Sequence, residues 1–478
     1  MQYLYNVNVT EVNAMNAKIK QFTEDHIEEL KADIKELCSI PSVLGDAGDG
    51  APFGAVCRDA LLRAGQICEK YGFPTTNYDN YCVAADFDTA LPKHLDMLGH
   101  TDVVPAGEGW TVTEPFTVIE KDGRLYGRGV SDDKGPVLCA LYAMRAIKES
   151  GIPLKKNVRL ILGSDEETGS IDITKYYARE PEADYTFSPD AEFPLINIEK
   201  GQFRGTFKAS APVTGDGIEL VSLEAGVALN AVPNRCRIEF SGTYKEMLRS
   251  ACEEIKKVIP IDYEISDDTH VLIIGESAHA STPETGVNAG LAGISLLKLL
   301  PVSDNKRNKL LKKVMELFPY GVYDGSGLGI SMTDKEGLSL SATLDLFSVD
   351  KDGMEFSFDS RSPLNATDEN CLKVAEKKCT DAGFIFSSPG IVPPHYVPSD
   401  SEFVKKLLSA YEDVTGLEGK AVGIGGGTYV HDVKNGVAFG AVLPGIDTHM
   451  HGADEFIDID NLKTAVEVFA EAILSICG

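Results

Sequence analysis

Hydrophobic residues recur every three or four positions in three stretches near the start of the chain. The stretches are 23–38, 53–71 and 134–149. Gly72 ends the second, and Pro136 lies near the first turn of the third, where its missing N–H costs no hydrogen bond. Because this is the period of an α-helix with one buried face, the pattern predicts three helices.

Short apolar runs alternate with these helices. They are HLDMLG (94–99), VRLILG (158–163) and DYTFS (184–188), and each leads into a polar segment. Nearly continuous apolar runs of this length are typical of strands that are buried on both faces. Strands that alternate with helices therefore predict an α/β fold with a mostly parallel sheet flanked by helices.

The pattern changes near residue 200. Segments such as 203–209 and 237–242 alternate between apolar and polar residues, as half-buried antiparallel strands do, and helical stretches at 244–257 and 287–300 interleave with them. These features predict an α+β domain in this part of the chain.

After a Pro-rich connector at 389–398 the alternation of helices and strands returns. We expect helices at 402–414 and 461–476 and a strand at 437–443. The simplest organisation is a discontinuous α/β domain formed by 1–198 and 392–478, with an α+β domain formed by 199–391 inserted into it, because inserted domains enter at exposed loops.

The charge of the chain narrows the function. Its 478 residues contain 45 Lys and Arg against 73 Asp and Glu, a formal net charge of −28. Nucleic-acid binding needs a basic face, and an anionic membrane surface attracts cations, so we expect neither partner.

Cysteine usage and hydropathy indicate the compartment. The ten cysteines form no CxxC pair, as in proteins with buried reduced thiols. The first thirteen residues lack the basic and apolar regions of a signal peptide, and no run approaches the ~18 apolar residues of a membrane span. We expect a cytoplasmic protein.

Polar residues with metal-binding side chains follow three of the predicted strands. The strand ends read Gly99-His100-Thr101-Asp102, Ser164-Asp165-Glu166-Glu167 and Ser188-Pro189-Asp190. Ligands of open parallel sheets gather beyond the carboxyl ends of the strands. Imidazole and carboxylates without thiolate suit Zn²⁺, Mn²⁺ or Co²⁺ in a hydrolytic site.

Six ordered motifs carry a resemblance that extends through most of the chain. They are GHTDVVPAGEGW (99–110), GRGVSDDKGP (127–136), GSDEETGS (163–170), SPDAEFPL (188–195), GGGTYVHD (425–432) and THMHGADEFI (448–457). The sequence resembles the M20 family of metallopeptidases, and most closely its PepV-type bacterial dipeptidases.

The resemblance implies a centre with two divalent metal ions. His100 and Asp190 would bind the first ion, His451 and Glu167 the second, and Asp132 would bridge both. Zn²⁺ is the expected ion, with Mn²⁺ and Co²⁺ as alternatives.

Two further acidic residues receive roles from the resemblance. Asp102 would hold the His100 ring, and Glu166 would be the general base. Asp133 is an alternative bridging ligand, but the family pattern of Asp, any residue, Lys, Gly favours Asp132. His449 could compete for a metal, but the spacing HGADE favours His451.

The inserted domain resembles the family's lid. His279 would stabilise the oxyanion, Arg361 would bind the substrate's terminal carboxylate, and Asn230 would lie near the substrate. In the Gly-rich loop, Gly426 and Thr428 would offer backbone N–H groups to the same carboxylate.

The chain departs from the family at one motif. PepV-type sequences usually carry an arginine soon after GGGTY, where this chain reads Val430-His431-Asp432. We expect altered recognition of the carboxyl terminus unless His431 or Arg361 compensates.

Together these features predict a cytoplasmic, monomeric metallo-dipeptidase that hydrolyses unblocked dipeptides with metal-activated water. Two alternatives remain open. One is a hydrolase of N-acyl amino acids, and the other is a catalytically silent homologue that binds a peptide or a metal.

Overall fold

The computed structural model describes residues 9–215 and 217–478, and these form two compact units. Unit 1 comprises Met1–Ile198 and Tyr396–Gly478, and unit 2 comprises Glu199–His395. The chain returns to unit 1 four residues later than the pattern predicts. Residues 1–8, which carry part of the expectation about a signal peptide, lie outside the described residues.

The sheet of unit 1 has parallel strands at its centre. β3 lies between β6 and β7, and β7 also pairs with β20, and these three pairings are parallel. Antiparallel neighbours flank them, so the sheet is mixed at its margins. In sheet order the strands are β1 (Thr75–Tyr78), β2 (Cys82–Asp86), β6 (Asn157–Gly163), β3 (Lys93–His100), β7 (Tyr185–Ser188), β20 (Gly436–Ala438), β8 (Leu195–Glu199) and β18 (His395–Tyr396), and β19 (Ala421–Ile424) pairs with β8.

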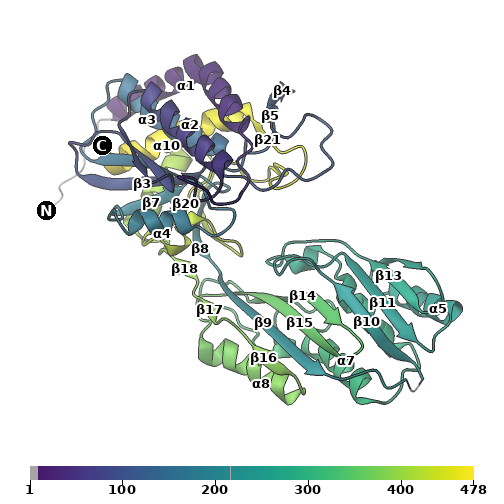
Figure 1. Cartoon of the computed structure of the whole chain (residues 1–478). Helices are drawn as coiled ribbons and strands as arrows, with labels where there is room; N and C mark the ends of the chain where they lie inside the picture. The colour runs from purple at the N-terminus through teal and green to yellow at the C-terminus, as the bar shows by residue number, and fades with distance from the viewer. Residues whose placement is uncertain (1–8, 216) are drawn as a thin grey trace. The chain divides into compact units, whose positions relative to one another are not determined.

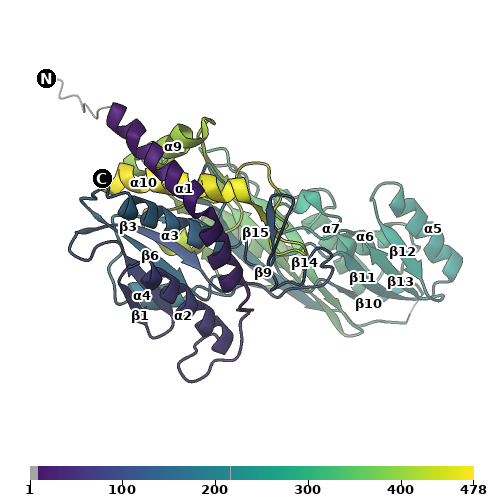
Figure 2. The same cartoon turned by 90° about the horizontal axis from the view of Figure 1, so that it is seen from above.

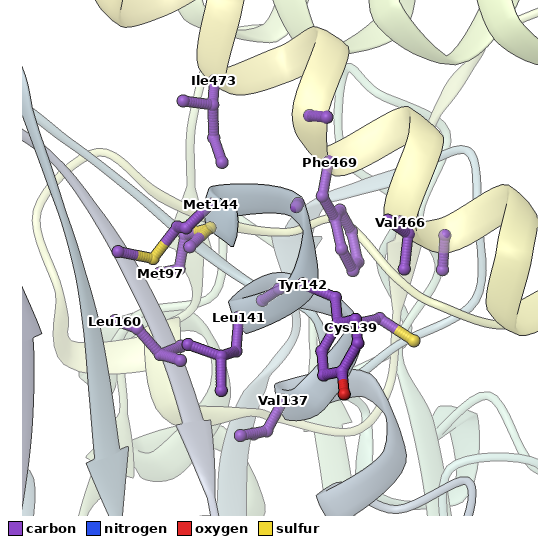
Figure 3. Packing of buried hydrophobic residues seen from close by; sticks show 14 of the residues in the cluster. Met97, Val137, Cys139, Leu141, Tyr142, Met144, Leu160, Val466, Phe469 and Ile473 are labelled. Carbon is purple, nitrogen blue, oxygen red and sulfur yellow. The ribbon is translucent and has the colours of Figure 1, made fainter. Parts of the chain in front are cut away.

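Helices from both ends of the chain bury one face of this sheet. Met97 of β3 and Leu160 of β6 face α3, and α10 packs on α3 through Val466, Phe469 and Ile473 (Figure 3). Figures 1 and 2 show α1, α3 and α10 together over the sheet. The helices of this cluster are α1 (Val9–Cys38), α2 (Ala55–Lys70), α3 (Lys134–Glu149), α9 (Glu402–Thr415) and α10 (Ile459–Cys477).

A smaller cluster covers the opposite face. It joins Leu98 and Ile161 to Tyr176 of α4 (Ile171–Tyr177) and to Tyr429 of the 3₁₀ turn Tyr429–Asp432. Leu98 and Met97 are neighbours that point to opposite faces, as successive strand residues do. Burial on both faces explains why these strands read as continuous apolar runs.

One strand is shorter than the apolar run that predicted it. The apolar run 437–443 forms a strand only as far as Ala438. Beyond it, Phe439 N donates to Ser188 O and Ala441 N donates to Ala191 O. The backbone of Ala191 lies so close to Gly440 that no side chain fits there, which requires glycine. These contacts keep the rest of the run buried, although it does not continue the strand.

The turns at the edge of unit 1 are tied by a small antiparallel sheet. In it β21 (Phe456–Asp458) pairs with β5 (Arg124–Tyr126), and β5 pairs with β4 (Ile119–Lys121). β5 precedes the loop that carries Asp132, and β21 follows the loop that carries His451. Among the described residues, no helix is long and apolar enough to cross a membrane.

Unit 2 is an antiparallel sheet with helices packed into one buried cluster. The helices are α5 (Lys245–Lys256), α6 (Ala289–Ser295), α7 (Lys306–Leu317) and α8 (Lys373–Asp381). The strands, in sheet order, are β12 (Asp262–Ile265), β13 (His270–Ile274), β11 (Arg235–Ser241), β10 (Glu219–Ala225), β14 (Ser341–Val349), β15 (Gly353–Ser362), β9 (Gly201–Ser210) and β16 (Ile385–Ser387), and β17 (Ile391–Val392) pairs with β9.

Two buried carboxylates lie side by side on the central strands of unit 2. Asp359 N donates to Asp345 Oδ2 over 3.2 Å, and both side chains are fully buried. Asp359 is paired with Arg361 and Arg204. Burial and the neighbouring Asp359 raise the pKa of Asp345 to about 9. Asp345 is therefore protonated in the folded chain at neutral pH.

This pKa predicts how stability depends on pH. An unfolded Asp titrates near 3.9, so the free energy of unfolding falls by up to about 1.4 kcal/mol for each pH unit as pH rises from about 4 to about 9. Asp345→Asn keeps an acceptor for Asp359 N and carries no charge. We expect a higher unfolding temperature than the wild type at pH 8 and a similar one at pH 4, measured by calorimetry. A variant that is destabilised equally at both pH values would contradict this.

Candidate functional site

The carboxyl ends of the parallel strands bring three polar segments to one edge of the sheet. His100 is the last residue of β3, Glu166 and Glu167 follow β6, and Asp190 follows β7. Because these strands are parallel neighbours, their ends meet at this edge. The sequence predicted this placement, and the loop before α3 adds Asp132.

Five of these side chains form two groups that share Asp132. In the first group, His100 Nε2 lies 3.1 Å from Asp132 Oδ1 and 3.5 Å from Asp190 Oδ2. In the second, His451 Nε2 lies 2.8 Å from Asp132 Oδ2 and 3.3 Å from Glu167 Oε2. Each oxygen of Asp132 thus faces a different imidazole.

The donor atoms of both groups fit a divalent cation. His100 Nε2 and Glu167 Oε1 are buried and make no hydrogen bond with the described residues, although carboxylate oxygens converge on the ring. A nitrogen that approaches two carboxylates without bonding to them is in the arrangement that a metal ion would satisfy. Imidazole nitrogen with carboxylate oxygen is a donor set for Zn²⁺, Mn²⁺ or Co²⁺.

Burial and neighbouring charges shift the pKa values within the two groups. Burial alone would raise the pKa of Asp132, but His100 and His451 outweigh it and hold that pKa well below its ordinary value. Hydrogen bonds to Asp132 and Glu167 raise the pKa of His451 to about 10. Burial and the nearby Asp132 raise the pKa of Asp190 to about 6. Positive charge between these carboxylates, of the kind that a divalent cation would supply, favours their charged forms.

Glu166 lies outside both metal groups and lines the same cavity. It is half-buried, and its pKa lies well above the ordinary value, chiefly because burial disfavours the charged form. Glu166 therefore presents a carboxyl group to the cavity that belongs to neither ligand group.

Asp102 contacts three residues of the site. Its Oδ1 accepts from Glu166 N over 3.3 Å, and its Oδ2 accepts from Glu167 N over 3.1 Å. The His100 ring lies 3.4 Å from the carboxylate by its Nδ1, but the shorter contact, 3.0 Å, is to the backbone oxygen of Asp102. The carboxylate of Asp102 therefore mainly holds the backbone of the two glutamates, while its carbonyl orients the ring.

The structure adds residues that sequence reasoning missed. Asp133, considered only as a metal ligand, lies outside both groups, and its Oδ2 accepts from His100 N over 3.1 Å. Asp172 Oδ2 accepts from Ser164 N and Tyr429 OH, each over 2.6 Å, and burial raises the pKa of Asp172 to about 7. Tyr429 stood inside a recognised motif, whereas no sequence signal pointed to Asp172.

A cavity of about 460 Å³ opens beside the two groups in unit 1. Its polar end contains Asp132, Glu166, Asp190 and His451, and its wall includes the Gly-rich loop. Gly426 and Thr428 both line it. The apolar part of the wall is formed by Ile196, Ile424, Val442, Ile446 and Met450.

Unit 2 brings its own three candidate residues together. Ala231, next to Asn230, forms an antiparallel bridge with His279, and Ala280 N donates to Asn230 O. Arg361 pairs in register with Ser341, whose hydroxyl approaches Ser281 O at 3.5 Å, two residues from His279. The three candidates therefore lie on adjoining segments of one unit.

The contacts of His279 and Arg361 define their chemistry. Ser281 N donates to His279 Nδ1 over 3.2 Å, so a neutral ring carries its proton on Nε2, as a donor to an oxyanion would. Arg361 Nε donates to Asp359 Oδ1 over 2.7 Å, and the side chain is 9% exposed. The guanidinium is held in place by this pair.

The two remaining candidate histidines lie outside the metal groups found among the described residues. The ring of His449 packs edge-on against Phe456, with centroids 5.7 Å apart. His431 is half-buried in the 3₁₀ turn after the Gly-rich loop. The ligand assignment to His451 thus agrees with the geometry.

Comparisons with known proteins agree with this architecture. Residues 97–475 match the family described as peptidase family M20/M25/M40. The chain is 35% identical over 466 residues to the Beta-Ala-Xaa dipeptidase of Lactobacillus delbrueckii subsp. lactis, covering 96% of this chain and 98% of the relative.

Solved structures share the fold at much lower identity. Human carnosine dipeptidase 1 superposes with a TM-score of 0.58 at 15% identity, covering 96% of this chain and 98% of that one. The dipeptidase Dug1p of Saccharomyces cerevisiae gives 0.56 at 16% identity, with the same two coverages. The resemblance seen in the motifs and the predicted fold class are confirmed. This chain belongs to peptidase family M20/M25/M40.

Proposed function

We propose that this chain is a metal-dependent dipeptidase that hydrolyses the peptide bond of unblocked dipeptides. The observation that carries the proposal is the pair of imidazole–carboxylate groups that share Asp132 beside the carboxyl of Glu166. A relative that is 35% identical and nearly equal in length is named Beta-Ala-Xaa dipeptidase. A small peptide is therefore the proposed substrate, and a cytoplasmic monomer is the proposed form.

The metal ligands are proposed from the two groups. His100 and Asp190 would hold one ion, Glu167 and His451 the other, and Asp132 both. When bound, two divalent ions would polarise the scissile carbonyl and lower the pKa of a water molecule. Zn²⁺ is the proposed ion, with Mn²⁺ or Co²⁺ as alternatives.

The remaining chemistry belongs to the chain's own residues. Glu166 takes a proton from the attacking water and gives it to the leaving amine, a task for a carboxyl whose pKa lies above its ordinary range. Asp102 holds the backbone amides of Glu166 and Glu167, so that one glutamate ligates while the other transfers the proton.

We assign substrate binding to unit 2 and the Gly-rich loop. In this proposal unit 2 is a lid, His279 donates to the oxyanion, and Asn230 lies near the substrate. Arg361 binds the terminal carboxylate, together with backbone N–H groups of Gly426 and Thr428. The gathering of the three unit 2 residues on adjoining segments supports the assignment. Arg361 would replace the arginine that this chain lacks after GGGTY.

The first prediction concerns metal and substrate. Removal of metal should abolish cleavage of a dipeptide panel, because the metal ions are the proposed Lewis acids of the site. Addition of Zn²⁺, Mn²⁺ or Co²⁺ should restore cleavage. N-acetyl and N-succinyl amino acids should be cleaved poorly. Product formation is followed by chromatography. Cleavage confined to the blocked substrates would favour an N-acyl amino acid hydrolase, and no restored cleavage would favour a silent homologue.

The second prediction concerns the general base. Glu166→Gln should lower kcat by about 10²–10⁴-fold, since the proton transfer is lost. Bound metal, measured by atomic emission, should stay near the wild-type level because Glu166 belongs to neither ligand group.

The matched control is Glu28→Gln on the exposed face of α1. It should leave both kcat and metal content unchanged. Retention of activity by Glu166→Gln would exclude Glu166 as the base, and loss of metal would make it a ligand.

The third prediction concerns Arg361. Arg361→Met should raise KM for dipeptides by about 10- to 100-fold, because a hydrogen bond to a charged group contributes about 1.5–3 kcal/mol. Dipeptide amides, which lack the carboxylate, should be hydrolysed equally by variant and wild type. Arg204→Met, which removes the other cation paired with Asp359, is the control. An equal loss on both substrate classes would show a structural role only.

A further inference from the structure

A buried ion pair lies next to the metal groups without belonging to either. Arg128 Nη1 contacts Glu455 Oε2 at 2.6 Å, and the two side chains are 1% and 0% exposed. The partners are 327 residues apart in sequence. Arg128 follows β5 and Glu455 precedes β21, two strands that pair with each other. The pair therefore joins two loops at the point where they leave the small sheet.

Glu455 fixes the loop that carries Asp132. Its Oε1 accepts from the backbone N–H groups of Gly129 and Ser131 and from the Ser131 hydroxyl, each over 3.0 Å. Ser131 is the residue before Asp132. A carboxylate that accepts several backbone N–H groups sets the path of that backbone.

Arg128 fixes the loop that carries His451. Its Nη2 donates to the carbonyl oxygens of His451 and Gly452, each over 3.1 Å. His451 has a φ of 63°, in the left-handed region that non-glycine residues rarely adopt. A residue keeps this backbone conformation when its surroundings hold it in place. Here the guanidinium of Arg128 donates to the carbonyl of His451 itself.

From these contacts we infer that Arg128 and Glu455 are positioning residues for the metal centre. The pair holds Asp132 and His451 at the separation that lets one ion bind between them. A guanidinium is required because one group must reach a carboxylate and two carbonyls at once, which an ammonium does not match in geometry. The side chain of Trp110, 5.6 Å from the guanidinium, covers it. The inference rests on the proposed two-metal site.

The pair should act on one ion more than on the other. The pair bonds to the backbone beside both Asp132 and His451, which belong to one group, whereas the group of His100 and Asp190 shares only Asp132 with it. Loss of the pair should therefore lower the affinity for the ion bound by Asp132, Glu167 and His451 more than the affinity for the other ion. Substitution of groups that orient metal ligands typically costs about 10–100-fold in affinity.

The test measures metal affinity rather than turnover. The metal-free full chain is titrated with Zn²⁺ against a competing chelator, which resolves two dissociation constants. Glu455→Gln replaces the carboxylate that faces Arg128 with an uncharged amide of similar size. We expect it to weaken the binding of the ion held by Asp132, Glu167 and His451 by about 10- to 100-fold, and the binding of the other ion, which shares only Asp132 with it, by less. Arg128→Met combined with Glu455→Met, which leaves no unpaired buried charge, should weaken the binding of the same ion.

A matched control separates positioning from stability. Arg159 and Asp96 form another buried pair in unit 1, 2.7 Å apart, with Asp96 four residues before His100 on β3. Arg159→Met should lower the unfolding temperature of the metal-free chain without changing either constant.

The outcomes distinguish the inference from the proposed function. If the wild type binds two ions and Glu455→Gln changes neither constant, the pair does not position the site. Equal weakening of both constants by Glu455→Gln and by Arg159→Met would also overturn the inference, since general destabilisation would explain it. A wild type that binds no second ion would overturn the proposed metal centre together with the inference.

Discussion

Asp132 lies between two imidazoles, and the neighbouring carboxylates are organised around that contact. Asp190 lies close to the His100 ring and Glu167 to the His451 ring, while Asp133 accepts from the backbone N–H of His100. Like charges this close would repel one another in a buried place. Positive charge between them, from protons on the rings or from metal ions, is what makes the arrangement stable.

Backbone N–H groups supply the rest of the compensation. Asp102 accepts from the amides that follow β6, and Asp133 accepts from the amide of His100. Asp102 and Asp133, which belong to neither group, thus hold the main chain of Glu167 and His100, which do. The site therefore has an inner set of acids that face the imidazoles and an outer set that bonds to the backbone.

Local and topological features of the site could be predicted from sequence, but long-range pairs could not. The helix Lys134–Glu149 and the strands before His100 and Glu166 follow from residue periodicity, and parallel topology then places the strand ends together. Tyr429 contacts Asp172 across 257 residues, and no pattern in one sequence encodes such a partner. The strand ends early, at Ala438, where the backbone of Gly440 lies against that of Ala191, and a hydropathy pattern carries no information about such a contact.

The discontinuity of unit 1 has a consequence for synthesis. Unit 2 is one uninterrupted stretch, so all its strands have been synthesised before residue 396 is added. Unit 1 lacks β20, α9 and α10 at that moment, and the face of α3 that packs on α10 has no cover. Since domains fold as units during translation, the inserted unit can complete its core first. His451 follows unit 2 in the chain, so the group of Asp132, Glu167 and His451 can form only after the inserted unit has been synthesised.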